Sequence, residues 1–288
     1  MMDANRRQFL LRTTATAGAA LGIASGSATA DHGPTGYVST RDHFDCDGNA
    51  LRDLDAYDTH DVPCFDRGCA DELLVHVHGW KNKDETDAFD AFENASEYLH
   101  AAGYDGDVIG WWWDSDCDWS TSKDNAWWNG KKLAHFVRDY RFLHGNDPTV
   151  RIMGHSLGVR VALSFAYYLE EHGVTWEAVR SMHLPGGAVP WDWPDHENLA
   201  AGLTDAVGAT FNYFNEDDSV LGWGAYKWAE AGGYALGKYG SENGGTCNFH
   251  DHDVTDWWGS GHSFHDYISH CNGRIVADMH SVDEYDQC

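Results

Sequence analysis

A serine near the middle of the chain has a glycine two positions before it and another two positions after it, in the stretch VRIMGHSLGVRVAL at residues 150–163. An apolar run typical of a strand precedes Ser156, and a run with helical spacing follows it. Such a strand-turn-helix serine needs very small residues at these two places, and Gly154 and Gly158 satisfy this need. The pattern predicts a nucleophilic Ser156. The alternative is a glycine-rich turn that carries a structural serine.

A nucleophilic serine also needs N–H donors for the oxyanion that forms on attack at a carbonyl group. The backbone N–H of Leu157, at the start of the following helix, is one expected donor. The other is expected near Trp80, in the loop after the strand-like stretch VHVHGW, where His78 and Gly79 should shape the turn.

Two histidine-containing patterns offer metal binding as an alternative. His76 and His78 would share one face of a strand, and HDHD occupies residues 250–253. No third ligand stands at a suitable spacing from the first pair, and the second pattern is expected by chance in a chain so rich in Asp and His. We therefore predict no metal ion and no cofactor.

The serine requires a base and an acid that orients the base, and in this kind of fold the acid precedes the histidine along the chain. The stretch NEDDSVL follows the strand-like run ATFNYF at 209–214. We favour Asp218 as the orienting acid, with Asp217 as the alternative and Glu216 as a weaker third candidate.

The histidine is expected in the glycine-rich loop of DVTDWWGSGHSFHDYI at residues 253–268, just before a terminal helix. We favour His262 as the base. His265 is the alternative, although it could instead lie on the surface of that helix.

These residues need a scaffold in which strands alternate with helices. Strands are predicted at 72–78, 107–113, 149–153, 178–184 and 209–214. Helices are predicted at 83–102 and 123–144, and from the serine to Gly173. This alternation predicts an α/β fold with a mostly parallel sheet covered by helices on both faces.

The N-terminal thirty residues have the features of an export signal. Arg6 and Arg7 form a twin-arginine pattern, an apolar stretch of small residues follows, and Ala28-Thr29-Ala30 resembles a cleavage site. We predict a signal peptide at 1–30, a cysteine-containing extension at 31–70 and a catalytic domain at 71–288. The protein would be exported by the twin-arginine route and be extracellular or attached to the cell surface, without an integral membrane anchor.

The chain is strongly acidic, with 46 Asp and Glu against 19 Lys and Arg and a formal net charge of −27. Such a surface repels nucleic acid and anionic membranes. The composition resembles that of proteins from extreme halophiles, in which concentrated salt screens the repulsion between carboxylates.

The roles of the cysteines and tryptophans are less well defined by the sequence. The seven cysteines include no CxxC pair, and their pairing does not follow from the sequence. Most of the 14 tryptophans are expected to serve packing. Trp80 and Trp113 lie at the ends of predicted core strands and are the better candidates for a pocket wall.

Taken together, the serine turn, the His-Gly loop and the Ser, Asp, His order resemble the α/β-hydrolase superfamily. Residues 73–173 are similar to esterase and lipase-like members with a "GxxGxxxxFSWxS" segment and an AHSMG-type turn. Here the corresponding segment is GYDGDVIGWWWDSD, Gly154 replaces the alanine, and Leu157 replaces the methionine. Residues 209–221 resemble the acid segment, and 31–70 have no counterpart.

The resemblance implies a serine hydrolase that cleaves a small-molecule or lipid ester. An amidase or peptidase with the same three residues is one alternative. A non-catalytic binding module on the same fold is another.

Overall fold

The computed structural model describes residues 33–82, 85–144, 148–174, 176–222, 226 and 233–282. The predicted signal peptide at 1–30 lies outside these residues. In the described part of the chain, no helix has both the length and the apolar character needed to cross a membrane.

The described strands form one mostly parallel sheet, in the order β2-β1-β4-β3-β5-β6-β7-β8. Only the β1–β2 pair is antiparallel. The strands span β1 (Gly36–Ser39), β2 (Asp58–His60), β3 (Glu72–Val77), β4 (Asp107–Trp112), β5 (Thr149–Gly154), β6 (Val179–Pro185), β7 (Val207–Phe214) and β8 (Phe249–Asp253).

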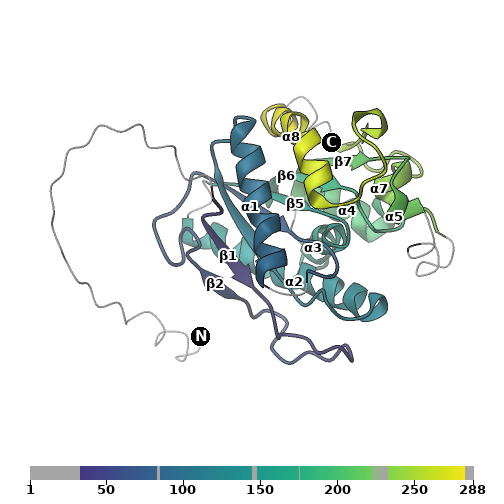
Figure 1. Ribbon diagram of the computed structural model, residues 1–288. Coiled ribbons are helices and arrows are strands. Elements are labelled where there is room, and N and C mark those ends of the chain that lie inside the picture. Colours follow the sequence, from purple (N-terminus) through teal and green to yellow (C-terminus); the bar gives the residue numbers. More distant parts are fainter. Residues whose placement is uncertain are drawn as a thin grey trace, which may run out of the picture. The chain divides into compact units, whose positions relative to one another are not determined.

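Helices cover both faces of this sheet (Figure 1). One group, α1 (Glu85–Ala101) and α8 (Phe264–His280), packs together on one face. The other face carries α2 (Trp119–His144), α3 (Gly158–Glu171) and α4 (Glu197–Ala206). Short helices occur in the connections, namely η2 (Trp193–Asp195), α5 (Ser219–Gly222), α7 (Leu236–Tyr239) and η3 (Thr255–Trp257).

Alternation along the central strand β3 explains why two cores form. Leu73, Val75 and Val77 are buried in the cluster that includes α2 and α3. Leu74 points the opposite way and is buried with the apolar residues of α1 and α8. Successive strand side chains project to opposite faces, so a strand covered on both sides reads as a continuous apolar run. The predicted α/β fold with a parallel sheet is confirmed.

Several boundaries differ from those predicted. Helix α2 begins at Trp119, not at residue 123, because the side chain of Asp118 accepts the backbone N–H groups of Ser120 and Thr121 and caps the first turn. The segment 31–70 was expected to be an extension, but it supplies β1 and β2 to the same sheet.

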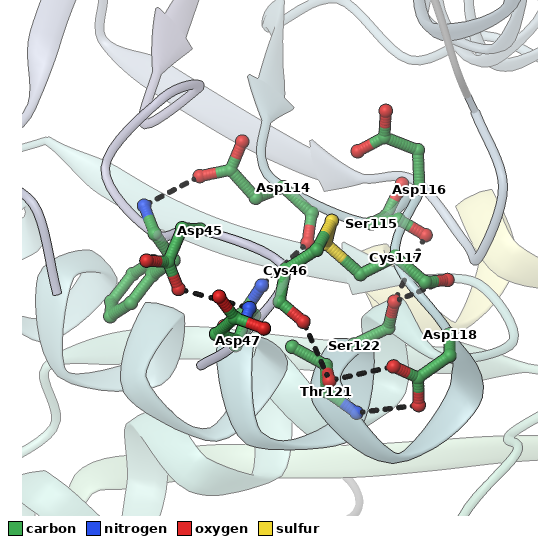
Figure 2. Close-up of a disulfide and its surroundings, with 12 residues drawn as sticks. Asp45, Cys46, Asp47, Asp114, Ser115, Asp116, Cys117, Asp118, Thr121 and Ser122 are labelled. Carbon is green, nitrogen blue, oxygen red and sulfur yellow. Dashed lines mark hydrogen bonds between the residues drawn. A yellow bond between two sulfur atoms is a disulfide. The ribbon is translucent and has the colours of Figure 1, made fainter. Parts of the chain in front are cut away.

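A disulfide attaches this N-terminal segment to the loop after β4. Cys46 and Cys117 are bonded across 71 residues of sequence (Figure 2). Figure 2 also shows the Thr121 hydroxyl donating to the backbone oxygen of Cys46, which lies beside the start of α2. A second disulfide joins Cys64 to Cys69, while Cys271 is a buried free thiol.

Candidate active site

The turn between β5 and α3 holds Ser156 in a strained backbone conformation. Its φ is +54°, in the left-handed region that residues other than glycine rarely adopt. A Cβ on Gly154 would lie 2.6 Å from the backbone oxygen of Gly158, and one on Gly158 would lie 2.3 Å from that of Val77. Glycine is therefore required at both positions, for the reason that the sequence pattern implied.

The structure brings Ser156, His262 and Asp218 together in one hydrogen-bonded chain. The hydroxyl oxygen of Ser156 lies 2.9 Å from Nε2 of His262, and Nδ1 of His262 lies 2.6 Å from Oδ2 of Asp218. A carboxylate oxygen can only accept here, so Nδ1 carries the proton and Nε2 is free to accept the serine proton. Ser156 is only 8% exposed and Asp218 is fully buried, so this series of hydrogen bonds is largely shielded from water.

Four donors hold the carboxylate of Asp218 in place. Oδ1 accepts the backbone N–H groups of Val220 and Leu221, at the start of α5. Oδ2 accepts His262 and also the hydroxyl of Tyr267, which lies 2.9 Å away on α8. Burial and the neighbouring Asp218 raise the pKa of Tyr267 well above its ordinary value, so this hydroxyl remains a donor. Sequence reasoning missed Tyr267 because only the packing of α8 brings it to the acid.

The alternative residues lie elsewhere. Asp217 and Glu216 are exposed, and the N–H of Asp217 bonds to the Asn215 side chain. His265 is exposed on α8, where its Nε2 lies 3.0 Å from the hydroxyl of Tyr98. None of these three is hydrogen-bonded to Ser156 or His262 in the described part of the chain.

Two backbone N–H groups next to Ser156 are available for an oxyanion. Within the described residues, neither the N–H of Leu157 nor that of Trp80 has a hydrogen-bond partner. A Cβ on Gly79 would lie only 3.1 Å from the Cβ of Ser156, so the His-Gly loop passes directly over the serine. These are the positions at which the sequence pattern placed the two donors.

His78 stabilises the loop that carries Trp80. Its buried ring accepts the backbone N–H of Trp113 at Nε2, and Nδ1 donates to the backbone oxygen of Gly79. Burial lowers the pKa of His78 to about 4, so the ring is neutral in the folded protein. Trp113, expected as a pocket wall, is instead fully buried, because its ring stacks on His78 and its indole N–H donates to the His78 backbone oxygen.

Trp80 is positioned from a second direction by the disulfide-bearing loop. Its indole N–H donates to the backbone oxygen of Cys117 over 3.1 Å, and the N–H of Lys81 donates to the backbone oxygen of Ser115. The Cys46–Cys117 disulfide therefore fixes the loop against which the expected oxyanion donor rests (Figure 2).

A further histidine next to the nucleophile was not singled out from the sequence. His155 is buried, and its Nε2 lies 3.0 Å from the backbone oxygen of His262. Burial and the neighbouring His262 hold the pKa of His155 well below its usual range. The neutral ring thus donates Nε2–H to the loop of the base. The position of His155 inside the GHSLG motif was the sequence feature that could have identified it.

The metal alternatives do not assemble in the described residues. His76 stacks on Phe264 with ring centroids 4.1 Å apart, and burial lowers its pKa to about 3. The HDHD stretch forms the edge strand β8, in which side chains alternate between faces. One geometric cluster of ligand atoms does occur, at Cys64, Cys69 and His144, but its two sulfurs are joined in a disulfide and are no longer thiolates.

The parallel sheet, the strained serine turn and the Ser, Asp, His order define the α/β-hydrolase fold. No protein-family model matches the chain, and no curated protein matches it either. Solved structures similar to it include an esterase from Pyrococcus furiosus, with 10% identity, a TM-score of 0.45 and coverage of 76% of this chain and 84% of that one.

Two further similar structures have comparable identities, TM-scores and coverages. An esterase from Pyrobaculum calidifontis shares 12% identity with a TM-score of 0.43, covering 74% of this chain and 77% of that one. An α/β serine hydrolase without a lid from Xanthomonas campestris shares 15% identity with a TM-score of 0.41, covering 76% and 84%. These are similarities of fold.

Proposed function

We propose that this protein is a serine hydrolase that cleaves carboxylic esters through an acyl-enzyme. The observation that carries the proposal is the unbroken hydrogen-bonded chain from Ser156 through His262 to Asp218. It lies beside two N–H groups, of Trp80 and Leu157, that have no partner among the described residues. Such a constellation activates a serine and stabilises an oxyanion.

In the acylation step, the hydroxyl oxygen of Ser156 attacks the ester carbonyl carbon while Nε2 of His262 takes the serine proton. Asp218 holds the imidazole in the correct tautomer and stabilises the imidazolium. The tetrahedral oxyanion is stabilised by the N–H groups of Trp80 and Leu157. The intermediate then collapses. The bond from the carbonyl carbon to the alcohol oxygen breaks, and the imidazolium returns its proton to that oxygen.

Deacylation repeats these steps with water as the nucleophile. His262 takes a proton from water, the hydroxide adds to the acyl carbon, and the bond to the Ser156 oxygen breaks. The proton returns to that oxygen, and a carboxylic acid leaves. The ester and one water supply every atom of the two products, the carboxylic acid and the alcohol, so these steps involve no cofactor.

We also propose that the protein works after export by the twin-arginine route. Disulfides persist outside the reducing cytosol, and Cys46–Cys117 and Cys64–Cys69 are consistent with that location. Fractionation of the expressing cells tests this point, and the protein should be recovered outside the cytoplasm in a form lacking residues 1–30. Lys substitutions of Arg6 and Arg7 should retain it inside.

Labelling with a fluorophosphonate, which reacts with activated serines, tests the enzymatic proposal. The unmodified chain and a Ser269→Ala control should be labelled, whereas Ser156→Ala should not. Hydrolysis of p-nitrophenyl acetate should fall by at least about 10³-fold in Ser156→Ala. Labelling or turnover that survives in Ser156→Ala would contradict the proposal. Faster cleavage of a matched p-nitroanilide would favour an amidase.

The two histidine candidates give a second, matched comparison. His262→Ala should lose about as much activity as Ser156→Ala, because the three residues act as a unit. His265→Ala removes an exposed ring that touches Tyr98 and should keep its rate. The opposite order would move the base to His265.

A further inference from the structure

Ser156 lies where two hollows of different chemistry meet. Both hollows are lined by Trp80, Ser156, Val220 and His262. One has a volume of about 220 Å³ and the other of about 450 Å³. A bound ester must place its acyl group on one side of the serine and its alcohol on the other. The residues that line the two hollows therefore determine which acyl and alcohol groups fit.

The smaller hollow is apolar. Beyond the shared residues it is lined by Trp119, Ala188, Leu221 and Tyr226. Ala188, Leu221 and Tyr226 are buried, and Trp119 packs edge-on against both Trp80 and Tyr226. None of the described lining residues is Asp, Glu, Lys or Arg. Such mostly apolar walls accept a hydrocarbon chain.

The larger hollow is rich in hydrogen-bond acceptors. The loop before α1 and the first half of that helix contribute Asn82, Asp87, Asp90 and Asn94. The amide nitrogens of Asn82 and Asn94 already donate to the backbone oxygens of Asp87 and Asp90. Each amide nitrogen has a second N–H, so the two amides can offer both a donor and an oxygen acceptor to a ligand, while the carboxylate of Asp90 offers acceptors only. Acceptors of this kind suit a ligand that presents several hydroxyl donors.

The chemistry of the proposed reaction decides which part of the ester enters which hollow. The protonated His262 must deliver its proton to the leaving alcohol oxygen, so the alcohol lies on the side of the histidine loop. Ser263 and Phe264, the two residues after His262, line the larger hollow and not the smaller one. The alcohol therefore occupies the acceptor-rich hollow, and the acyl group occupies the apolar one.

We propose that the natural substrates are esters of an apolar carboxylic acid with a neutral polyhydroxy alcohol, of the glycerol or sugar type. This inference rests on the proposed esterase function. An anionic alcohol would be repelled by Asp87 and Asp90. A cationic alcohol such as choline would be attracted by these carboxylates but would leave the amide groups of Asn82 and Asn94 without partners, so the choline ester is the competing arm of the test.

A crossed set of esters tests the proposal. Acetyl and octanoyl esters of ethanol and of glycerol are compared by kcat/KM, and the choline ester of octanoic acid is the cationic arm. The octanoyl ester of glycerol should be cleaved fastest, by about tenfold over the ethyl ester, since it gains one or two hydrogen bonds. A preference for the choline ester or for the ethyl ester would overturn the polyol assignment.

Variants on the two sides should change different ratios. Ala188→Val narrows the apolar hollow and should lower the ratio of octanoyl to acetyl rates by about tenfold. Asp90→Leu removes an acceptor and should lower the ratio of glyceryl to ethyl rates. Glu93→Leu makes the same kind of change on α1 at an exposed position outside the hollow and should alter neither ratio. If both ratios move together in either single variant, the division into acyl and alcohol sides is wrong.

The two proposals fail in different ways. If Ser156 is not labelled by the fluorophosphonate and no ester is cleaved, the esterase function itself is wrong. If Ser156 is labelled and p-nitrophenyl acetate is cleaved, but glyceryl and ethyl esters react equally fast, only the substrate inference is overturned.

Discussion

Nε2 of His155 lies 3.0 Å from the backbone oxygen of His262, so the residue before the nucleophile holds the loop that carries the base. The contact joins the turn after β5 to the segment before α8, which are 107 residues apart in the chain. The neutral state of His155 suits this task, because a second positive charge next to the imidazolium of His262 would oppose catalysis.

We therefore expect His155→Ala to lower kcat by about 10- to 100-fold with little change in KM, because a small misplacement of a catalytic group is costly. His155→Gln should recover part of the rate, since its amide can still donate. Steady-state kinetics with p-nitrophenyl acetate, at a temperature where thermal melts show every variant folded, provide the measurement. An unchanged kcat in folded His155→Ala would show that the contact has no part in positioning the base.

The neighbouring acids allow another matched comparison. Asp218→Asn should lower kcat by about 10⁴-fold, because the amide favours the wrong tautomer of His262. Asp217→Asn changes an exposed side chain and should have little effect. Tyr267→Phe removes one of the donors to Asp218, and its kcat should lie between those of Asp218→Asn and Asp217→Asn. Equal losses in Asp218→Asn and Asp217→Asn would show that the acid is misassigned.

The Cys46–Cys117 and Cys64–Cys69 disulfides should contribute unequally to stability. Replacing Cys46 and Cys117 by serine opens a link across 71 residues and should cost about 4 kcal/mol of unfolding free energy in the chain-entropy picture. It should also lower kcat/KM, because the Cys117 carbonyl holds the Trp80 indole. The Cys64→Ser/Cys69→Ser pair spans five residues and should cost less and leave kcat/KM intact. Urea melts and ester kinetics on both pairs decide this.

Buried neutral histidines should make the protein sensitive to acid. Burial lowers the pKa of His76 and of His183 to about 3 and that of His78 to about 4. In the unfolded chain these rings bind a proton near pH 6.5, whereas in the folded protein they stay neutral down to about pH 4. The stability of the fold is therefore unaffected by these rings above pH 6.5 and decreases as the pH falls from there towards 4.

Each such histidine should remove about 1.4 kcal/mol of unfolding free energy per pH unit below about 6. Urea melts at pH 7, 6 and 5 measure the slope. His280→Gln, at an exposed position on α8, is the control and should leave the slope unchanged. An unfolding free energy that stays level over this range would mean that the buried rings are accommodated in their charged form.

The formal net charge of −27 leads to an expectation about salt. The Debye length falls from about 10 Å at 0.1 M to about 3 Å at 1 M, so repulsion between surface carboxylates should be largely screened at the higher concentration. We expect the melting temperature and the ester turnover to rise between 0.1 and 2 M KCl and then to level off. A melting temperature that does not depend on KCl would remove the reason for regarding the protein as halophilic.

The sequence predicted the parts of the site that local geometry controls. A strained turn admits only glycine at positions 154 and 158, and a parallel sheet brings the ends of β5 and β7 to one edge, so Ser156 and an acid after β7 could be placed in advance. Position after the strand, not residue type, indicated the segment that holds Asp218, whereas Asp217 and Glu216 in the same segment stayed open as alternatives.

What the sequence did not reveal depends on packing between distant segments. Tyr267 reaches Asp218 only because α8 lies against the sheet, and no periodicity encodes that approach. The strands β1, β2 and β8 are short and lie towards the edges, so their side chains lack the continuous apolar run of a central strand. The start of α2 was missed although Asp118, followed by Ser120 and Thr121, carried a readable capping signal.

The carboxylate of Asp218 performs two tasks with its two oxygens. One oxygen faces His262, and the other anchors the first turn of α5, whose Val220 and Leu221 line the hollows beside the serine. Substitutions within α5 that reshape the hollow would disturb the acid as well, and would change rate and substrate choice together. Among the described residues no hydrogen bond joins Trp119 or Ala188 to Asp218, so substitutions at these two positions should change substrate range with less effect on the acid. The residues next to the acid are expected to vary least.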